Sequence, residues 1–233
     1  MSADEVSAGQ AVYDGRMLRI YDLAVLGLSC SVIWRCPKAR LQSLYDEHVG
    51  AAHVDVGVGT GYFLDHARWP VERPRVALVD MNPNCLEYTA DRIRRYNVTT
   101  HRANALESLP LPSSAFDSAS ANFLLHCMPG SISEKAVLFD QLAAAVRPGG
   151  VVFGSTLLSS GVDNSRLARA VMRKYNARGI FHNSRDTLDD LEAALSDRFD
   201  HYDVEVKGSV AMFTAGASLR DRATDLARTT GNG

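Results

Sequence analysis

The chain has 233 residues, 46% of them hydrophobic and 22% charged, and a formal net charge of −2 at pH 7. This length and composition are typical of one α/β domain with an appendage, and the charge gives no reason to expect nucleic acid as the main partner. The four cysteines are scattered without a CxxC pair, and no apolar run approaches membrane-spanning length. We therefore expect no metal site, no membrane span and a cytoplasmic protein with reduced thiols.

The N-terminal part of the chain has a helical pattern. Between positions 13 and 52 apolar residues recur at spacings near three and four, and Pro37 interrupts them. Two or three short helices are therefore expected there. We expect residues 1–50 to form a helical N-terminal cap, residues 51–217 to form the core, and residues 218–233 to be a flexible tail.

Strand and helix patterns then alternate. Short buried-strand patterns occupy 53–57, 75–80, 98–102, 116–122 and 151–155, and helical patterns occupy 62–68, 84–96, 134–146, 164–176 and 188–197. Such alternation predicts βαβ units and a doubly wound parallel sheet with helices on both faces. The sequence Arg147-Pro148-Gly149-Gly150 is expected to end the helix before the fifth strand. The last two strands, 202–206 and 210–214, are joined by three residues and must form an antiparallel hairpin.

A glycine-rich loop joins the first strand to the helix after it. Gly57, Gly59 and Gly61 allow a sharp turn and a close approach of a ligand to the backbone. A dinucleotide-binding loop would need glycine at position 62, where Tyr62 stands. Asp55 precedes the loop and would repel a pyrophosphate, whereas it suits a ligand that carries positive charge. The loop therefore favours a nucleoside ligand other than a dinucleotide.

A second carboxylate ends the second predicted strand. Asp80 lies 19 positions after Gly61, where a carboxylate can accept hydrogen bonds from both hydroxyls of a ribose. The alternative is that Asp80 caps the helix that begins near Pro83. Together with the glycine loop, the pattern favours ribose binding.

These motifs resemble those of the class I S-adenosylmethionine-dependent methyltransferases. The matching segments are 54–61, 79–81, 104–105, 121–126 and 142–151, and the stretch 21–37 is similar to small methyltransferases of bacterial and fungal secondary metabolism. The resemblance implies a Rossmann-like, doubly wound, seven-stranded sheet, mostly parallel, with a C-terminal antiparallel hairpin. It also implies S-adenosyl-L-methionine (SAM) as cofactor and S-adenosyl-L-homocysteine (SAH) as product.

The resemblance implies a role for each residue of the cofactor site. The glycines would line the methionine and ribose, Asp55 would hold the ammonium, Asp80 would bind the ribose, and Met81 would pack on the adenine, although Met81 could also be a core residue. Asn104 stands where the family usually has an acidic residue, and its carbonyl oxygen could still accept from the adenine amino group. The predicted cofactor-binding residues are Asp55, Gly57, Gly59, Gly61, Asp80, Met81, Asn104, Ala105, Asn122 and Phe123.

The acceptor side is predicted from polar and aromatic side chains near the end of the fourth strand. His126 is the leading candidate for acid–base catalysis, because imidazole titrates near neutral pH. His182 is a weaker second choice for this role, and Tyr21 is a further catalytic candidate. His126 could instead be a hydrogen-bonding loop residue. The residues predicted to contact the acceptor are Tyr13, Trp34, Phe181 and His182. Tyr21 and Trp34 could instead pin the N-terminal helices to the core.

The sequence therefore predicts an enzyme that methylates a small molecule, such as an aromatic secondary metabolite. Alternatives are a methyltransferase for protein or RNA and a cofactor-binding homologue without activity. The end of the fourth strand reads Asn122-Phe123-Leu124-Leu125, unlike the Asn-Pro-Pro-Tyr type of tetrapeptide in enzymes that methylate amino groups of nucleic acids and proteins. The expected partner is thus a small-molecule acceptor, with no nucleic acid, no membrane and a possible homodimer.

Overall fold

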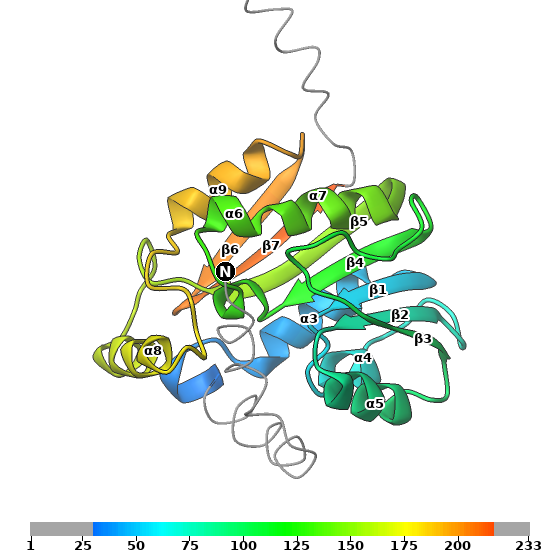
Figure 1. The fold of residues 1–233 in the computed structure, drawn as a ribbon, viewed down its shortest axis with the longest axis horizontal. Helices are drawn as coiled ribbons and strands as arrows, with labels where there is room; N and C mark the ends of the chain where they lie inside the picture. The colour runs from blue at the N-terminus through cyan, green and yellow to red at the C-terminus, as the bar shows by residue number, and fades with distance from the viewer. Residues whose placement is uncertain (1–29, 217–233) are drawn as a thin grey trace, which may run out of the picture.

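A seven-stranded sheet forms the centre of the computed structural model, which describes residues 30–216 (Figure 1). The strand order is β3-β2-β1-β4-β5-β7-β6, and only β7 runs against its neighbours. The strands are β1 (Ala52–Val56), β2 (Arg75–Asp80), β3 (Asn97–Arg102), β4 (Phe116–Asn122), β5 (Val146–Leu157), β6 (Tyr202–Lys207) and β7 (Val210–Gly216). The Rossmann-like sheet and its terminal hairpin are as predicted. The order reverses between β1 and β4, which is where ligands bind in such sheets.

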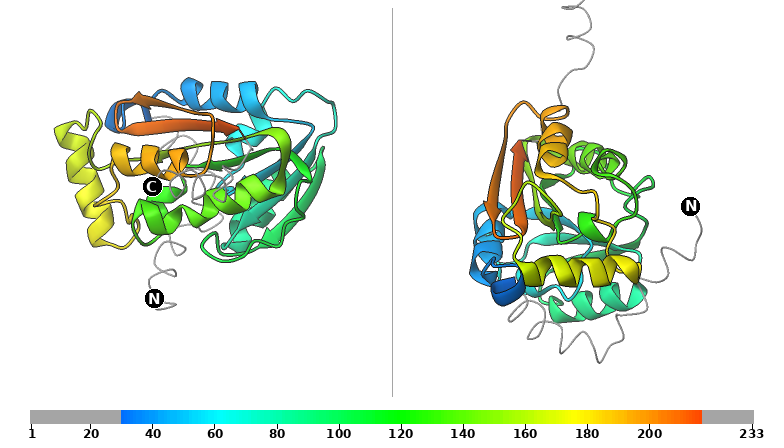
Figure 2. Two further views of the ribbon diagram at one scale, coloured as in Figure 1. Left: turned by 90° about the horizontal axis from the view of Figure 1, so that it is seen from above. Right: turned by 90° about the vertical axis from the view of Figure 1, so that its left-hand side faces the viewer.

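Helices cover both faces of the sheet, and each face has its own apolar core (Figures 1 and 2). One face is covered by α6 (Ile132–Lys135), α7 (Val137–Ala145) and α9 (Leu188–Ser196). The other is covered by α3 (Lys38–His48), α4 (Tyr62–His66), α5 (Pro83–Arg92) and α8 (Arg166–Ala177). The valines and leucines of β1 and β2 are buried between these layers, which explains their continuous apolar patterns.

Two predicted boundaries near the start of β5 differ from the structure. The expected helix 134–146 is divided at Ala136 into α6 and α7, and Ser131 caps α6 through a capping box with Glu134. The sequence from Arg147 to Gly150, expected to be a helix stop, lies within β5. A register shift between β4 and β5 lies in this stretch, and such an irregularity lets Pro148 stand in a strand without breaking the ladder.

The N-terminal cap is described only in part. α3 packs against the sheet through buried Leu41, Leu44 and Tyr45, whereas Tyr13 and Tyr21 lie outside the described residues. The division of the chain at residue 50, and the tail over 218–233, remain predictions. Within residues 30–216, no helix is long and apolar enough to cross a membrane.

Candidate functional site

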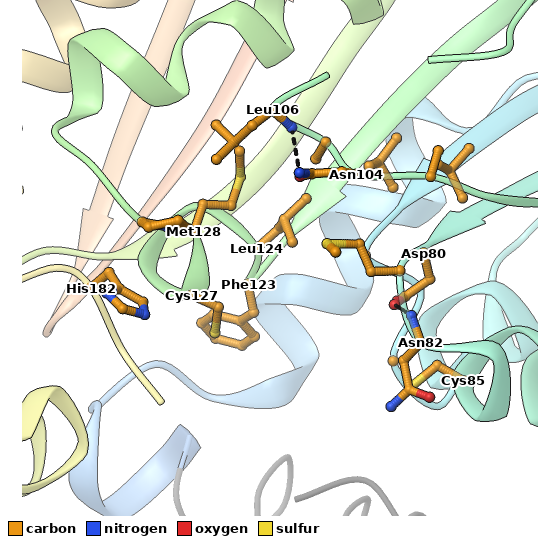
Figure 3. A pocket seen from close by; sticks show the side chains of 18 of the residues that line it. Asp80, Asn82, Cys85, Asn104, Leu106, Phe123, Leu124, Cys127, Met128 and His182 are labelled. Atoms are coloured by element: carbon orange, nitrogen blue, oxygen red, sulfur yellow. Dashed lines mark hydrogen bonds between the residues drawn. The ribbon is translucent and has the colours of Figure 1, made fainter. Parts of the chain in front are cut away.

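A cleft opens beyond the carboxyl ends of the first four strands, at the point where the strand order reverses (Figure 3). Figure 3 shows Asp80 and Asn82 at one end, His182 and Met128 at the other, and Phe123 and Leu124 between them. A smaller side pocket adjoins the cleft and shares Gly57, Gly59 and Phe123 with it. The cleft is lined by Val56, Gly57, Gly59, Val79, Asp80, Met81, Asn82, Cys85, Ala103, Asn104, Ala105, Leu106, Phe123, Leu124, Cys127, Met128, Pro129, Gly179, Ile180 and His182. The side pocket is lined by Tyr45, Asp55, Gly57, Val58, Gly59, Thr60, Gly61, Tyr62, Phe63, Leu64, Asn122 and Phe123.

The three loop glycines all have positive φ, but each is needed for a different reason. A Cβ on Gly57 would lie 2.8 Å from Leu124 Cδ1, and one on Gly61 would lie 2.5 Å from Thr89 Cγ2. A Cβ on Gly59 would meet nothing within 4 Å, because this residue faces the open space of both cavities. Gly57 and Gly61 therefore allow the loop to pack closely against neighbouring side chains, whereas Gly59 leaves room for a ligand beside the backbone.

The close contact at Gly61 predicts a loss of stability on substitution. Gly61→Ala combines a left-handed backbone, φ +67°, with overpacking against α5 and should cost about 2–4 kcal/mol. Gly149→Ala is the matched control, because Gly149 has φ +80° and open space around it; it should cost about 1–2 kcal/mol. Urea unfolding of both variants measures the difference. Equal losses in the free energy of unfolding would show that Thr89 moves away from the new methyl group at no cost.

Asp80 presents its carboxylate to the cleft at the end of β2. Its Oδ1 accepts a hydrogen bond from the Asn82 backbone N–H at 2.8 Å. Burial raises the pKa of Asp80 to about 6, opposed by backbone N–H groups of Asn82, Gly59 and Val58. The N-cap of α5 is Asn82, whose side chain accepts from Asn84 N–H at 3.0 Å. The role of helix cap is thus filled by another residue, and Asp80 is left to face a ligand.

Asp55 lies behind the glycine loop and lines the side pocket. It is 3% exposed and accepts hydrogen bonds from the Tyr45 hydroxyl at 3.2 Å and from Ser120 Oγ. Burial raises its pKa to about 6, and the negative charge of Asp80 acts in the same direction, whereas the two hydroxyl donors lower it. A cation in the side pocket would therefore meet a carboxylate that is already oriented.

The predicted adenine-binding residues all line the cleft. Met81 is half-buried and packs with neither of the two apolar cores described above, which disfavours the alternative that it is a core residue. Asn104 Oδ1 accepts from Leu106 N–H at 3.1 Å, and its amide donates to Glu107 at 3.0 Å. The Asn104 side chain thus shapes the turn, and its carbonyl oxygen is already engaged by the backbone.

Asn122 is the last residue of β4 and Phe123 follows it, so both stand at the mouth of the fourth strand. Phe123 has φ +53°, a left-handed conformation that is uncommon for a bulky residue and is typical of functional sites. Its backbone N–H donates to Ser155 O at 2.8 Å, which holds this turn in place. Asn122 lines the side pocket, and its Oδ1 accepts from the Ser155 hydroxyl.

The structure corrects the prediction that His126 is the acid–base residue. His126 is 4% exposed, does not line the cleft, and its Nδ1 accepts from Leu157 N–H at 3.4 Å. Its ring packs edge-to-face on Phe181, with centroids 4.6 Å apart. Burial lowers its pKa to about 3, and nearby Lys135 lowers it further. His126 is therefore placed as the alternative interpretation has it, as a buried hydrogen-bonding histidine outside the cleft.

Of the predicted acceptor contacts that the structure describes, only His182 lines the cleft. Trp34 and Phe181 are 4% and 8% exposed and pack on each other, with centroids 6.2 Å apart. Trp34 also accepts a backbone hydrogen bond from Ser209 at 2.9 Å. Trp34 thus pins the N-terminal part to the core, as the alternative interpretation stated, and Phe181 packs beneath the segment that carries His182.

Several residues around the two cavities were not predicted from the sequence. Cys127 and Met128 line the cleft where His126 was expected, because the short 3-10 helix η2 (Leu125–Cys127) turns His126 into the core. Ser118 and Ser120 contact His53, and their alternation along β4 was a usable signal, since residues two apart share one face of a strand. Among the described residues, no group of three His, Cys, Asp or Glu side chains could hold a metal ion.

Comparisons with known proteins agree with this geometry. Residues 54–150 match the family described as "Methyltransferase domain". Demethylluteothin O-methyltransferase from Streptomyces thioluteus is 49% identical over 211 residues, which cover 91% of this chain and 92% of that protein. The physcion biosynthesis cluster O-methyltransferase of Aspergillus chevalieri is 34% identical over 209 residues, 89% of this chain and 94% of that protein. The solved structure of DhpI in complex with SAH has a TM-score of 0.62 at 16% identity, covering 93% and 99% of the two chains, and it supports the fold.

Proposed function

Because this chain belongs to the class I SAM-dependent methyltransferases that act on small molecules, we propose that it methylates a hydroxyl oxygen of a neutral, largely apolar acceptor. The lining of the cleft is the observation that carries the proposal. Within residues 30–216, neither lysine nor arginine lines the cleft, so a phosphorylated or carboxylated acceptor would find no counter-charge there. That two of the relatives are named O-methyltransferases supports transfer to oxygen.

The methyl donor would occupy the end of the cleft near Asp80 and extend into the side pocket. Asp80 would accept hydrogen bonds from the ribose hydroxyls, and Met81 would pack on the adenine beside Asn104 and Ala105. Asp55 would attract the ammonium of the methionine moiety beside Asn122. Gly59 fits this ligand because a side chain there would fill the space that both cavities share. When bound, SAM supplies an electrophilic methyl carbon on a sulfonium.

The acceptor would lie at the other end of the cleft. Met128 and His182 lie there (Figure 3), and Leu124, Pro129 and Ile180 add apolar surface to the lining of the same cleft. An apolar wall with one polar group can orient a flat molecule and place its hydroxyl. His182 would take the hydroxyl proton as the oxygen attacks the methyl carbon.

The proposal is tested by binding and by transfer. SAH should bind with a dissociation constant roughly in the micromolar range by calorimetry. Labelled methyl groups from SAM should then enter phenols or enols in a panel that includes the matching arylamines and phosphorylated phenols. Label that enters the amines or the phosphorylated compounds preferentially would contradict the proposed acceptor, and label in protein or RNA would contradict a small-molecule acceptor.

His182→Gln is expected to lower kcat with the best phenol about a hundredfold, because the variant removes the group that accepts the proton. Affinity for SAH should be unchanged, since His182 lies at the end of the cleft away from Asp80. Raising the pH should recover part of the loss, because the phenol then ionises by itself. His201→Gln, at an exposed position before β6, is the matched control. A kcat that stays at the wild-type value would show that alignment alone suffices.

A further inference from the structure

A chain of buried hydrogen bonds runs across the sheet and ends at Asp55. Gly50 N–H donates to Ser118 Oγ at 2.8 Å, and Ser118 Oγ lies 2.8 Å from His53 Nδ1. His53 Nε2 lies 3.0 Å from Ser120 Oγ, whose hydroxyl donates to Asp55 Oδ1. His53, Ser118 and Ser120 are each 0% exposed. The chain therefore connects the start of β1 to the side pocket without contact with solvent.

An ionised Asp55 sets the direction of this chain of hydrogen bonds. Ser120 has one hydroxyl proton and gives it to Asp55, so the contact with His53 requires a proton on His53 Nε2. The neutral ring then has a lone pair on Nδ1, which accepts from the hydroxyl of Ser118. Burial lowers the pKa of His53 to about 3, so the ring stays neutral. Every proton in the chain therefore points toward the carboxylate.

We propose that His53 and Ser120 are positioning residues that hold Asp55 ionised, so that the side pocket presents a carboxylate to the cofactor's ammonium. The relay, meaning Ser118, His53 and Ser120 in this order, rests on the proposed role of Asp55 toward SAM. None of the three lines the cleft or the side pocket, so we expect them to act on the cofactor through Asp55.

The surroundings of Asp55 explain why a relay is needed. Burial and the charge of Asp80, on the neighbouring strand β2, both favour the neutral acid. On the other side, α3 contributes only the Tyr45 hydroxyl, whose own pKa is raised well above its usual value by burial, so it stays a donor. The Ser120 hydroxyl is thus one of two donors that favour the ionised form, and His53 polarises it.

The test compares two ligands over pH. Adenosine would contact Asp80 but lacks the ammonium that Asp55 would attract. Titration of Asp80 should therefore change the affinities for SAH and adenosine alike, and the ratio of the two affinities should depend on the protonation state of Asp55. In the wild type this ratio should fall as pH decreases through about 6. In Ser120→Ala the pKa of Asp55 rises. If this pKa rises by about one unit, the ratio in the variant should be about five- to tenfold lower than in the wild type at pH 5.5–6, and nearly the same as in the wild type at pH 8.

His53→Phe extends the test to the far end of the relay. Phenylalanine keeps a ring beside Phe153 and Trp69 but leaves Ser120 without its donor. In His53→Phe the midpoint, meaning the pH at which the ratio of affinities is halfway through its fall, should lie between the values for the wild type and for Ser120→Ala. Trp69→Phe is the matched control, because Trp69 touches the same ring and donates elsewhere, to Leu64 O; its midpoint should equal that of the wild type.

Two results would overturn the relay. One is a loss of SAH affinity that is equal at pH 5.5 and pH 8, which would indicate a structural effect. The other is a midpoint in His53→Phe that equals the wild-type value. The carboxyl ¹³C signal of Asp55 in the free protein, assigned with Asp55→Asn, gives a readout without ligand. If the wild type binds no SAH, the proposed function fails, and this signal alone decides the relay: its midpoint must rise in both variants.

Discussion

Replacing Asp80 with alanine is expected to weaken SAH binding at least a hundredfold. The carboxylate would accept hydrogen bonds from two ribose hydroxyls, and bonds to a charged acceptor contribute about 1.5–3 kcal/mol each. The carboxylate also faces backbone N–H groups of Gly59 and Val58, so its loss removes an acceptor from the glycine loop itself. Calorimetric titration measures the affinity, with adenosine as a second ligand that should lose binding equally.

The control for Asp80 lies on the helix that follows it. Asp91 is exposed on α5 and pairs with Arg94 at 3.2 Å, so Asp91→Ala should leave both affinities within twofold of the wild type. Asp80→Asn keeps the shape but lacks the charge, and its affinity should lie between those of the wild type and Asp80→Ala. Affinity for SAH that survives Asp80→Ala would contradict ribose binding by this residue.

Lys135→Met is expected to lower the free energy of unfolding by about 3–5 kcal/mol, because the buried carboxylate of Asp186 loses the positive charge that pairs with it. Lys135 Nζ donates to Asp186 Oδ2 at 2.6 Å, and both side chains are 0% exposed. Burial alone lowers the pKa of Lys135 and raises that of Asp186, so each charge depends on the other. Among the described residues Asp186 Oδ1 has no hydrogen-bond partner, which leaves the carboxylate with little else to stabilise it.

The double variant Lys135→Met with Asp186→Leu should recover most of this stability, since apolar pairs replace buried ion pairs at little cost. Arg94→Met breaks an exposed pair and should change stability by less than about 0.5 kcal/mol. Urea unfolding measures all three. If the double variant is as unstable as Lys135→Met, the loss of stability comes from changed packing and not from the unpaired charge of Asp186.

The same ion pair fixes the segment that carries His182. Lys135 Nζ also donates to His182 O at 3.0 Å, and His182 N–H donates to His126 O at 2.7 Å. The backbone C=O and N–H of His182 are therefore both held by residues of the segment that follows β4. In the double variant the ring signal of His182 should broaden in NMR spectra while affinity for SAH stays unchanged.

The donor half of the site could be predicted from the sequence because its signals are local. The valine-rich strands, the glycines after β1 and the acid after β2 each act within a few positions of the chain, and parallel strands bring their ends to one edge. Asp80 was ambiguous on its own. In the structure Asn82, two residues later, provides the cap of α5, which favours the prediction that Asp80 binds a ligand.

The acceptor half depends on contacts between distant segments, which no local pattern shows. Lys135 and Asp186 are 51 positions apart, and nothing near either residue indicates the other. The orientation of His126 is set by the single turn of η2 and by Phe181, so proximity to the end of β4 was a misleading guide. The alternating serines of β4 were informative, but only once His53 and Asp55 are known to lie opposite them in the neighbouring strand.

The missing Cβ of Gly57 has a consequence for how the two ligands affect each other. Leu124 fills the space beside Gly57 and also lines the cleft. The same side chain would therefore contact the acceptor and adjoin the glycine loop that would bind SAM. An acceptor that shifts Leu124 must alter the loop, and thermodynamic linkage requires that the donor change the acceptor's affinity by the same factor. We therefore expect the affinities for substrate and cofactor to be coupled through the contact between Leu124 and Gly57.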